Sequence, residues 1–226
     1  MPTIKTEAVV LSKRPLWEAD RLYVLYTKDF GKLEAQVKSA ARPSSKQAGS
    51  LEPVSLVQVM IVKGKKRETI AGVQLIRRFK FDNYFAFSQA ALIRELFLKL
   101  IKPEVKDDVL YGNLISYLSS VENLQQPTGF SPLKVKFFSQ RFIWQMIKLL
   151  GHQPDLDSES DLSAEVKNLI KACLDQQPAT LQISSDLLQK LESYTQNYLY
   201  NLLESDLNSF YSPFYAKSFQ PEKTLG

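Results

Sequence analysis

The chain has 226 residues, of which 44% are hydrophobic, so it can build one large domain or two small ones with real cores. Its formal charge of +5 is uneven, because residues 1–80 hold 16 Lys and Arg against 7 Asp and Glu, whereas the remainder holds 13 against 17. The asymmetry favours an anion-binding N-terminal half on a near-neutral or acidic C-terminal half.

Cys173 and His152 are the only cysteine and the only histidine. One cysteine excludes an intramolecular disulfide, and a structural zinc site takes four Cys or His ligands, so we expect neither a metal nor a cofactor. Lys5 and Glu7 interrupt the N-terminus before an apolar signal segment can form, and no run reaches the roughly 20 apolar residues of a membrane helix. We therefore expect a cytoplasmic protein without a membrane partner.

The first third of the chain has the pattern of short β-strands. Apolar and polar residues alternate in Lys32–Lys38, and the longest β-like run, Val54–Val62, faces a second run across a turn that contains Gly64. Five short strands with glycine in the turns are typical of a small closed barrel. The expected strands are Glu7–Ser12, Asp20–Thr27, Lys32–Lys38, Val54–Val62 and Glu68–Ile76.

The hydrophobic period changes to that of helices near Phe79–Asp82. Ser131 and Pro132 form a cap and a first-turn proline that open a long helix, which stops at Gly151. The other expected helices are Phe85–Ile101, Val109–Val121, Leu162–Leu174 and Ser185–Leu203. The sequence thus predicts an α+β protein, with a five-stranded barrel domain at residues 1–80 and an all-α bundle at residues 81–226.

Two basic segments lie in the predicted barrel. The loop Ser39–Ser50 consists mainly of small residues, and cations recur every four residues at Lys38, Arg42 and Lys46. Small neighbours let the backbone approach a phosphate chain, although a solvated loop is the simpler alternative. The hairpin tip carries four more cations, which either contact phosphates or only aid solubility: Lys63, Lys65, Lys66 and Arg67.

Aromatic and acidic side chains near these segments allow two interpretations. Trp17 lies in the first turn and is either a stacking platform for a base or a cap on the barrel. Tyr23 and Tyr26 lie on opposite faces of one strand, so at least one of them is expected in the core. Glu18 and Asp20 form a carboxylate pair without a nucleophile or metal partner, and we interpret them as structural.

Several motifs, in order, give the chain a resemblance to the bacterial recombination mediator RecO family. They are EAVVL at Glu7–Leu11, EADRL at Glu18–Leu22, LYTKDFGKLEAQVKSAAR at Leu25–Arg42, GSLEP at Gly49–Pro53 and RFIWQMIKLLGHQPDLD at Arg141–Asp157. Two departures stand out. Ser158–Asp161 (SESD) occupies the place where many members have a Cys-rich zinc segment, and Ser39 stands where members usually have glycine.

The resemblance implies an N-terminal OB-fold that binds single- and double-stranded DNA and a helical domain that engages partners. It implies a DNA repair and recombination mediator, not an enzyme, that anneals complementary strands and with RecR helps load RecA onto DNA coated by single-stranded DNA-binding protein. The C-terminal tail of that protein is an expected partner, and a nucleoid-associated location follows. Candidate DNA-binding residues are Arg14, Arg21, Lys38, Arg42, Lys46, Lys63, Lys65, Lys66 and Arg67, and candidate partner-binding residues are Phe138, Arg141, Phe142, Lys148 and Leu149.

Two other function classes compete with this interpretation. A general OB-fold single-stranded nucleic-acid-binding protein without mediator activity would need the barrel alone, and the helical half argues against it. A metal-dependent nuclease would need clustered acids with metal geometry, whereas the barrel half has only seven acids, scattered along its sequence. Strand cleavage would support the enzyme, and annealing without divalent metal would support the mediator.

Overall fold

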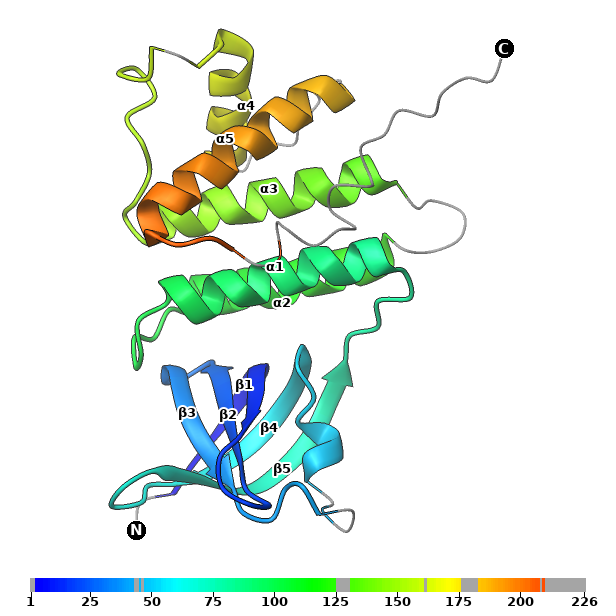
Figure 1. Cartoon of the computed structure of the whole chain (residues 1–226), viewed down its shortest axis with the longest axis vertical. Coiled ribbons are helices and arrows are strands. Elements are labelled where there is room, and N and C mark those ends of the chain that lie inside the picture. The colour runs from blue at the N-terminus through cyan, green and yellow to red at the C-terminus, as the bar shows by residue number, and fades with distance from the viewer. Residues whose placement is uncertain are drawn as a thin grey trace. The chain divides into compact units, whose positions relative to one another are not determined.

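The computed structural model describes residues 3–42, 45, 47–124, 131–160, 162–175, 183–207 and 209 (Figure 1). Within these residues five strands come first and five α-helices follow, which confirms the predicted α+β fold. The chain divides into two compact units, each of which consists of two separate segments of the sequence. The first is residues 1–80 with 94–115, and the second is residues 81–93 with 116–226. The division into domains at residue 80 stays a prediction.

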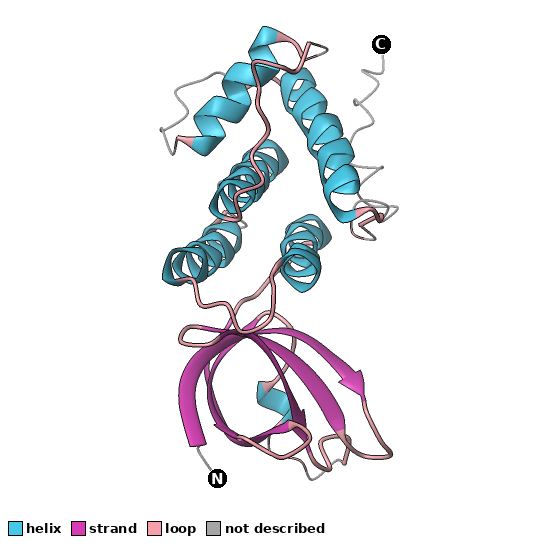
Figure 2. Ribbon diagram, turned by 90° about the vertical axis from the view of Figure 1, so that its left-hand side faces the viewer, coloured by secondary structure: helices cyan, strands magenta, loops and turns pink. Residues whose placement is uncertain are grey.

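The strands close into a barrel in the order β1-β2-β3-β5-β4, which is the strand order of an OB-fold (Figure 2). Neighbouring strands are antiparallel except β3 and β5, which run parallel and pair at only two positions. The strands are β1 (Thr3–Pro15), β2 (Arg21–Thr27), β3 (Gly31–Val37), β4 (Ser55–Val62) and β5 (Glu68–Arg78). A short 3₁₀ turn, η1 (Ala48–Ser50), precedes β4.

Strand β1 is longer than its apolar run predicts. Its first half pairs with β4 and its second half with β2, and the register shifts between Val10 and Ser12. The length of β1 lets it pair with β4 through one half and with β2 through the other, and the bulge supplies the bend between them. The polar ends of β1, including Lys13 and Arg14, are therefore strand residues, although the predicted apolar run covers only Glu7–Ser12.

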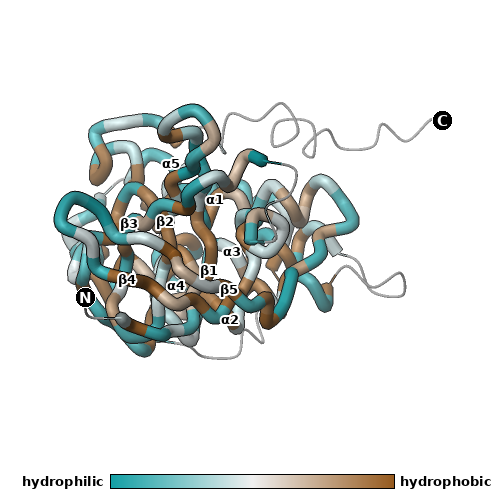
Figure 3. Tube along the Cα trace, turned by 90° about the horizontal axis from the view of Figure 1, so that it is seen from below, coloured by the Kyte–Doolittle hydropathy of each residue, from teal (hydrophilic) through white to brown (hydrophobic). Residues whose placement is uncertain are grey.

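The inward-facing residues of the strands fill the barrel mainly with aliphatic side chains. Figure 3 colours the backbone trace by hydropathy and shows hydrophobic residues of the strands in brown. Tyr23 belongs to this core, and Tyr26 is buried on the opposite face, where its ring centroid lies 4.9 Å from that of Phe97 and 6.1 Å from that of Tyr111. Burial raises the pKa of the Tyr26 hydroxyl well above its ordinary value. Both tyrosines are thus core residues, which leaves Trp17 as the aromatic candidate for base stacking.

The chain after α1 (Tyr84–Leu100) completes the open edge of β3. Pro103 pairs in parallel with Lys32, and the Glu104 N–H donates to the Lys32 carbonyl oxygen at 2.9 Å. The Lys32 ammonium donates to the Leu98 carbonyl oxygen at 2.8 Å, so it satisfies the C-terminal end of α1, and burial lowers its pKa. These bonds explain why residues 94–115 group with the barrel.

The helices begin at polar caps, and the one at Ser131 is the cap that the sequence predicts. The N–H of Ala86 donates to the Asn83 side chain at 2.8 Å, and Ser131 caps α3 with Pro132 in its first turn. The remaining helices are α2 (Asp108–Asn123), α3 (Pro132–Leu149), α4 (Ala164–Leu174) and α5 (Ser185–Leu203). Among the described residues, no helix combines the length and apolar character needed to cross a membrane.

The core of the helical unit contains a buried ion pair. The Lys136 ammonium on α3 lies 2.9 Å from the Glu192 carboxylate on α5, and both side chains are less than a tenth exposed. Burial lowers the pKa of Lys136, and Glu192 opposes that shift. Nearby on the same two helices, the fully buried Trp144 indole donates to the Thr195 hydroxyl at 3.1 Å. Helices α3 and α5 are therefore joined by polar contacts as well as apolar packing.

Candidate nucleic-acid interface

Three separate segments of the barrel line one pocket of about 450 Å³. The β1–β2 turn contributes Trp17, the end of β3 contributes Gln36 and Lys38, and the β4–β5 hairpin contributes the rest. Barrel closure brings these segments together, and the β1–β2 and β4–β5 loops are the ones that OB-folds use for oligonucleotides. The nine lining residues are Trp17, Gln36, Lys38, Val62, Gly64, Lys65, Lys66, Arg67 and Thr69.

The pocket is strongly cationic. Four of its nine lining residues are Lys or Arg, and none is Asp or Glu. All four cations are exposed, so their charged groups are accessible to a polyanion. Sites for small ligands commonly measure about 300–1,000 Å³, and this one falls within that range. The pocket therefore suits a segment of a phosphate chain with an attached planar group.

The hairpin tip is tight because glycine permits a close approach of the backbone. A Cβ atom at Gly64 would lie 2.2 Å from the Arg67 carbonyl oxygen, which no side chain tolerates without a shift of the tip. The turn projects Lys65, Lys66 and Arg67 as three consecutive exposed cations. Glycine at this position thus determines where the hairpin presents its charge.

Two hydrogen bonds join the turn of Trp17 to the segment after Lys38. The Ser39 N–H donates to the Asp20 carboxylate at 2.7 Å, and the Ala41 N–H donates to the Ala19 carbonyl oxygen at 2.8 Å. Asp20 therefore has the structural role that its lack of a catalytic partner predicts. Ser39 has φ +56°, in the left-handed region that favours glycine, which fits its place in a family pattern that usually has glycine.

The other cations of the predicted DNA-binding set are distributed more widely. Arg42 is exposed but does not line the pocket, and Lys46 lies outside the described residues. Arg14 lies 3.6 Å from the carboxylate of Glu34, so its charge is partly balanced at the surface. Arg21 at the start of β2 is half-buried.

Lys63 lines a second pocket of the barrel unit, of about 200 Å³, together with Glu68 and Glu104. Burial raises the pKa of the Glu68 carboxyl, and the nearby Lys63 opposes that shift. Sequence reasoning grouped Lys63 with its neighbours on the hairpin, whereas in space its surroundings are acidic. The structure therefore separates Lys63 from Lys65, Lys66 and Arg67.

Sequence reasoning missed two polar residues of the cationic pocket, Gln36 and Thr69. Their side chains share a hydrogen bond of 3.2 Å across the short parallel contact of β3 with β5. The available signal was the polar face of the predicted third strand, where Gln36 alternates with apolar residues. Their amide and hydroxyl groups add neutral hydrogen-bonding capacity beside the cations.

The predicted partner-binding residues on α3 divide into exposed and buried groups. Phe138 and Leu149 are 38% and 40% exposed, and Arg141 is half-buried. Phe142 is 5% exposed and packs against Tyr117, so its ring belongs to the core and cannot cover a partner. The surface that remains for a partner is Phe138, Arg141 and Leu149.

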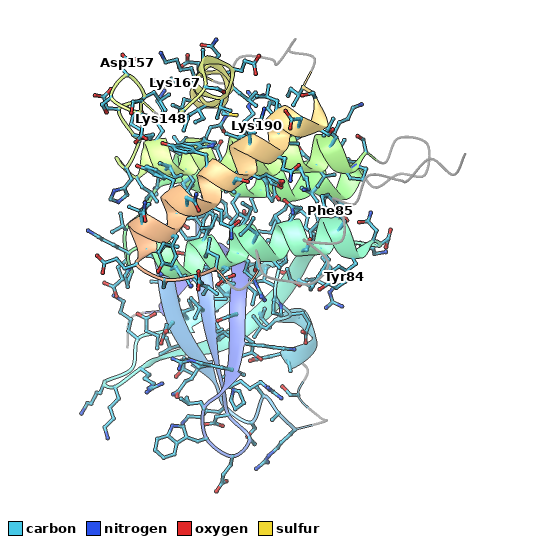
Figure 4. All side chains as sticks on the ribbon, turned by 45° about the horizontal axis from the view of Figure 1, so that its top comes forward. Tyr84, Phe85, Lys148, Asp157, Lys167 and Lys190 are labelled. Atoms are coloured by element: carbon cyan, nitrogen blue, oxygen red, sulfur yellow. The ribbon has the colours of Figure 1, made fainter. Side chains whose placement is uncertain are left out.

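Lys148 supports the C-terminal end of α4. Its ammonium donates to the Leu174 carbonyl oxygen at 3.2 Å and lies 3.9 Å from the Asp175 carboxylate. Lys148 also lines a pocket of about 490 Å³, to which Asp155, Asp157 and Asp175 contribute. Figure 4 shows Lys148 and Asp157 at the same end of the helical unit. With three acids against two lysines, this pocket is a poor place for an acidic tail.

The segment after the Pro-Asp-Leu turn offers no ligand cluster in the part of the chain that the structure describes. No group of three or more His, Cys, Asp or Glu residues there could hold a metal ion. Burial raises the pKa of the Cys173 thiol to about 12, so this side chain stays protonated at neutral pH. Cys173 therefore acts as a small core residue.

Comparison with known proteins gives consistent matches. Residues 1–79 match the family model described as recombination protein O N terminal. DNA repair protein RecO of Thermoanaerobacter sp. (strain X514) is 31% identical over 160 residues, and that of Caldanaerobacter subterraneus is 29% identical over 160 residues; each match covers 70% of this chain and 62% of the relative. DNA repair protein RecO of Cutibacterium acnes is 26% identical over 159 residues, 69% of this chain and 64% of that protein. The chain thus spans less than two thirds of these relatives.

Proposed function

This chain belongs to the RecO family of DNA repair proteins, and on that basis we propose that it binds single- and double-stranded DNA and anneals complementary strands. With RecR, it would help load RecA onto DNA coated by single-stranded DNA-binding protein. These activities are proposals for the chain itself, because it spans only part of the length of its relatives. The proposed location is the cytoplasm, in association with the nucleoid.

The observation that supports DNA binding best is the cationic pocket between Trp17 and the β4–β5 hairpin. Lys and Arg that neutralise phosphates release counterions, and this release supplies most of the affinity for DNA of any sequence. Phosphate contacts carry no sequence information, so the binding is expected to be independent of sequence. The exposed indole beside the cations adds a stacking surface of the kind that OB-folds use for single strands.

Annealing follows from the same charges without a catalytic residue. Two complementary strands repel each other through their phosphates, and this repulsion falls when cations screen or neutralise both strands. Base pairing then drives the reaction. The cations of the pocket, together with the nearby loop cation Arg42, are the groups we assign to this task.

For the helical unit we propose contact with the acidic tail of single-stranded DNA-binding protein. A cation beside exposed apolar side chains suits an acidic peptide with an apolar end. Arg141 with Phe138 and Leu149 on α3 meets that requirement, whereas the pocket beside Lys148 does not. This assignment leaves the barrel free for DNA.

An annealing assay with two substrates tests the proposal. The protein should accelerate annealing of bare complementary strands in the presence of a chelator, because the charges of its own side chains suffice. On strands coated by single-stranded DNA-binding protein, the acceleration should disappear when the tail of that protein is deleted.

Failure to accelerate the annealing of bare strands would overturn the proposed function. Cleavage of the strands in divalent metal would instead identify a nuclease. If coated strands anneal equally with and without the tail, the proposed contact with the tail is wrong, whereas the proposed DNA binding stands.

A further inference from the structure

We propose that the cationic pocket is a receptor for one unpaired base, with Trp17 as the stacking surface, so that Trp17 distinguishes single-stranded from double-stranded DNA. The inference rests on the proposed DNA binding and assigns different roles in it to the cations and to the indole. The cations serve both kinds of DNA, and the indole serves only the single strand.

The exposure of Trp17 rules out a role in the barrel core. Its side chain is 72% exposed, the largest value among the exposed large hydrophobic residues of the described chain. Trp144, the other tryptophan, is fully buried and hydrogen-bonded to Thr195. Because the indole lies at the surface and lines the cationic pocket, its aromatic face is accessible to a base.

The turn that carries Trp17 is held in place by hydrogen bonds of its backbone and of Asp20. Within its turn, the Leu16 N–H donates to the Asp20 carbonyl oxygen at 3.1 Å. The same turn accepts hydrogen bonds from Ser39 and Ala41 in the segment after Lys38. Because the backbone of this turn is already ordered, only the side-chain freedom of Trp17 has to be lost when a base stacks on it.

Other residues of the same pocket supply the charge that a base needs beside it. A base in a strand carries a phosphate on each side, and Lys38 and the hairpin cations Lys65, Lys66 and Arg67 share the pocket with Trp17. In a duplex each base is already stacked and paired inside the helix, so its face cannot reach the indole without disruption of the pair. The geometry thus favours a single strand at the indole and admits either form at the cations.

Substitutions of Trp17 test this inference by their effect on DNA affinity. Stacking is worth about 1–3 kcal/mol per base, so Trp17→Ala should weaken single-strand binding by about 5- to 150-fold. Duplex affinity and the salt dependence of single-strand binding should stay unchanged, since no phosphate contact is removed. Trp17→Phe should retain most of the single-strand affinity, because phenylalanine also offers an aromatic face.

Fluorescence provides the second readout. Wild-type protein minus Trp17→Phe isolates the signal of Trp17, and Trp144 in the variant serves as the internal control. A single-stranded oligonucleotide should quench the Trp17 signal, and the corresponding duplex should not. Both titrations are accompanied by anisotropy of labelled DNA, which measures binding independently of tryptophan.

The outcomes separate this inference from the proposed function. If anisotropy shows no binding of either DNA, the proposed function itself fails. If single strands bind but Trp17→Ala retains wild-type affinity, or if it weakens single-strand and duplex binding equally, the base receptor is wrong while DNA binding stands. Equal quenching by single strand and duplex would also overturn it.

Discussion

Gly31→Ala should lower the free energy of unfolding of the barrel unit by on the order of 4 kcal/mol, because two costs combine at one position. Gly31 has φ +66°, where any side chain is strained. A Cβ there would also lie 2.2 Å from the Val105 carbonyl oxygen, so the segment that completes the edge of β3 would have to move. Loss of that segment would expose the edge of the strand.

Urea unfolding followed by far-ultraviolet circular dichroism measures this effect. Gly112→Ala in α2 is the matched control in the same unit, because nothing lies within 4 Å of its added Cβ and alanine favours a helix by about 1 kcal/mol. The control should unfold at an equal or higher urea concentration. A Gly31→Ala protein that is as stable as wild type would show that residues 103–105 do not pack against β3 as described.

Glu192→Leu should destabilise the helical unit by about 3–5 kcal/mol, because it removes the carboxylate that balances the charge of the buried Lys136 ammonium. Trp144 is buried in the same unit and hydrogen-bonded to α5, so the shift of its fluorescence on unfolding reports the loss. The unfolding midpoint in urea is the quantity to compare.

A double variant and a change of pH identify the cause. Lys136→Met with Glu192→Leu removes both charges and should recover most of the stability. In Glu192→Leu alone, burial holds the pKa of Lys136 below its unfolded value, so the folded state binds fewer protons and stability should rise with pH toward the ordinary lysine value of about 10.4. A loss of stability that neither change reduces would assign the effect to packing of the leucine instead.

Local pattern was sufficient to predict the elements of the fold. Alternation identified β3, apolar runs rich in β-branched residues and bounded by turns identified the other strands, and the 3.6-residue period with Ser131 and Pro132 identified the helices. The ends of β1 were not predicted because their polar residues pair through backbone hydrogen bonds, and such pairing does not affect the hydrophobic pattern. The same holds for Pro103, whose pairing with Lys32 depends on barrel closure.

The sequence predicted the cations and the aromatic residue of the candidate site, but it predicted only in part which of them share a pocket. Sequence proximity placed Lys63 with Lys65–Arg67, yet the two sides of a hairpin face different surroundings, and Lys63 lines the pocket of Glu68. Trp17 is far in sequence from the hairpin, so only closure of the barrel could reveal that they share a pocket. Phe138 and Phe142 lie one helical turn apart on α3, so the sequence does not distinguish them. Only the structure shows that the Phe142 ring is buried in the core.

The salt dependence of single-strand binding tests the central claim, the cationic pocket as the DNA site, most directly. Lys38→Ala with Lys66→Ala should reduce the slope of log affinity against log salt by about 1.4, or about 0.7 for each phosphate contact removed. Lys134→Ala with Lys167→Ala changes the net charge equally on α3 and α4 and should leave the slope unaltered. Equal slopes for wild type and the pocket variant, or an equal reduction in both variants, would contradict the assignment and place the DNA elsewhere.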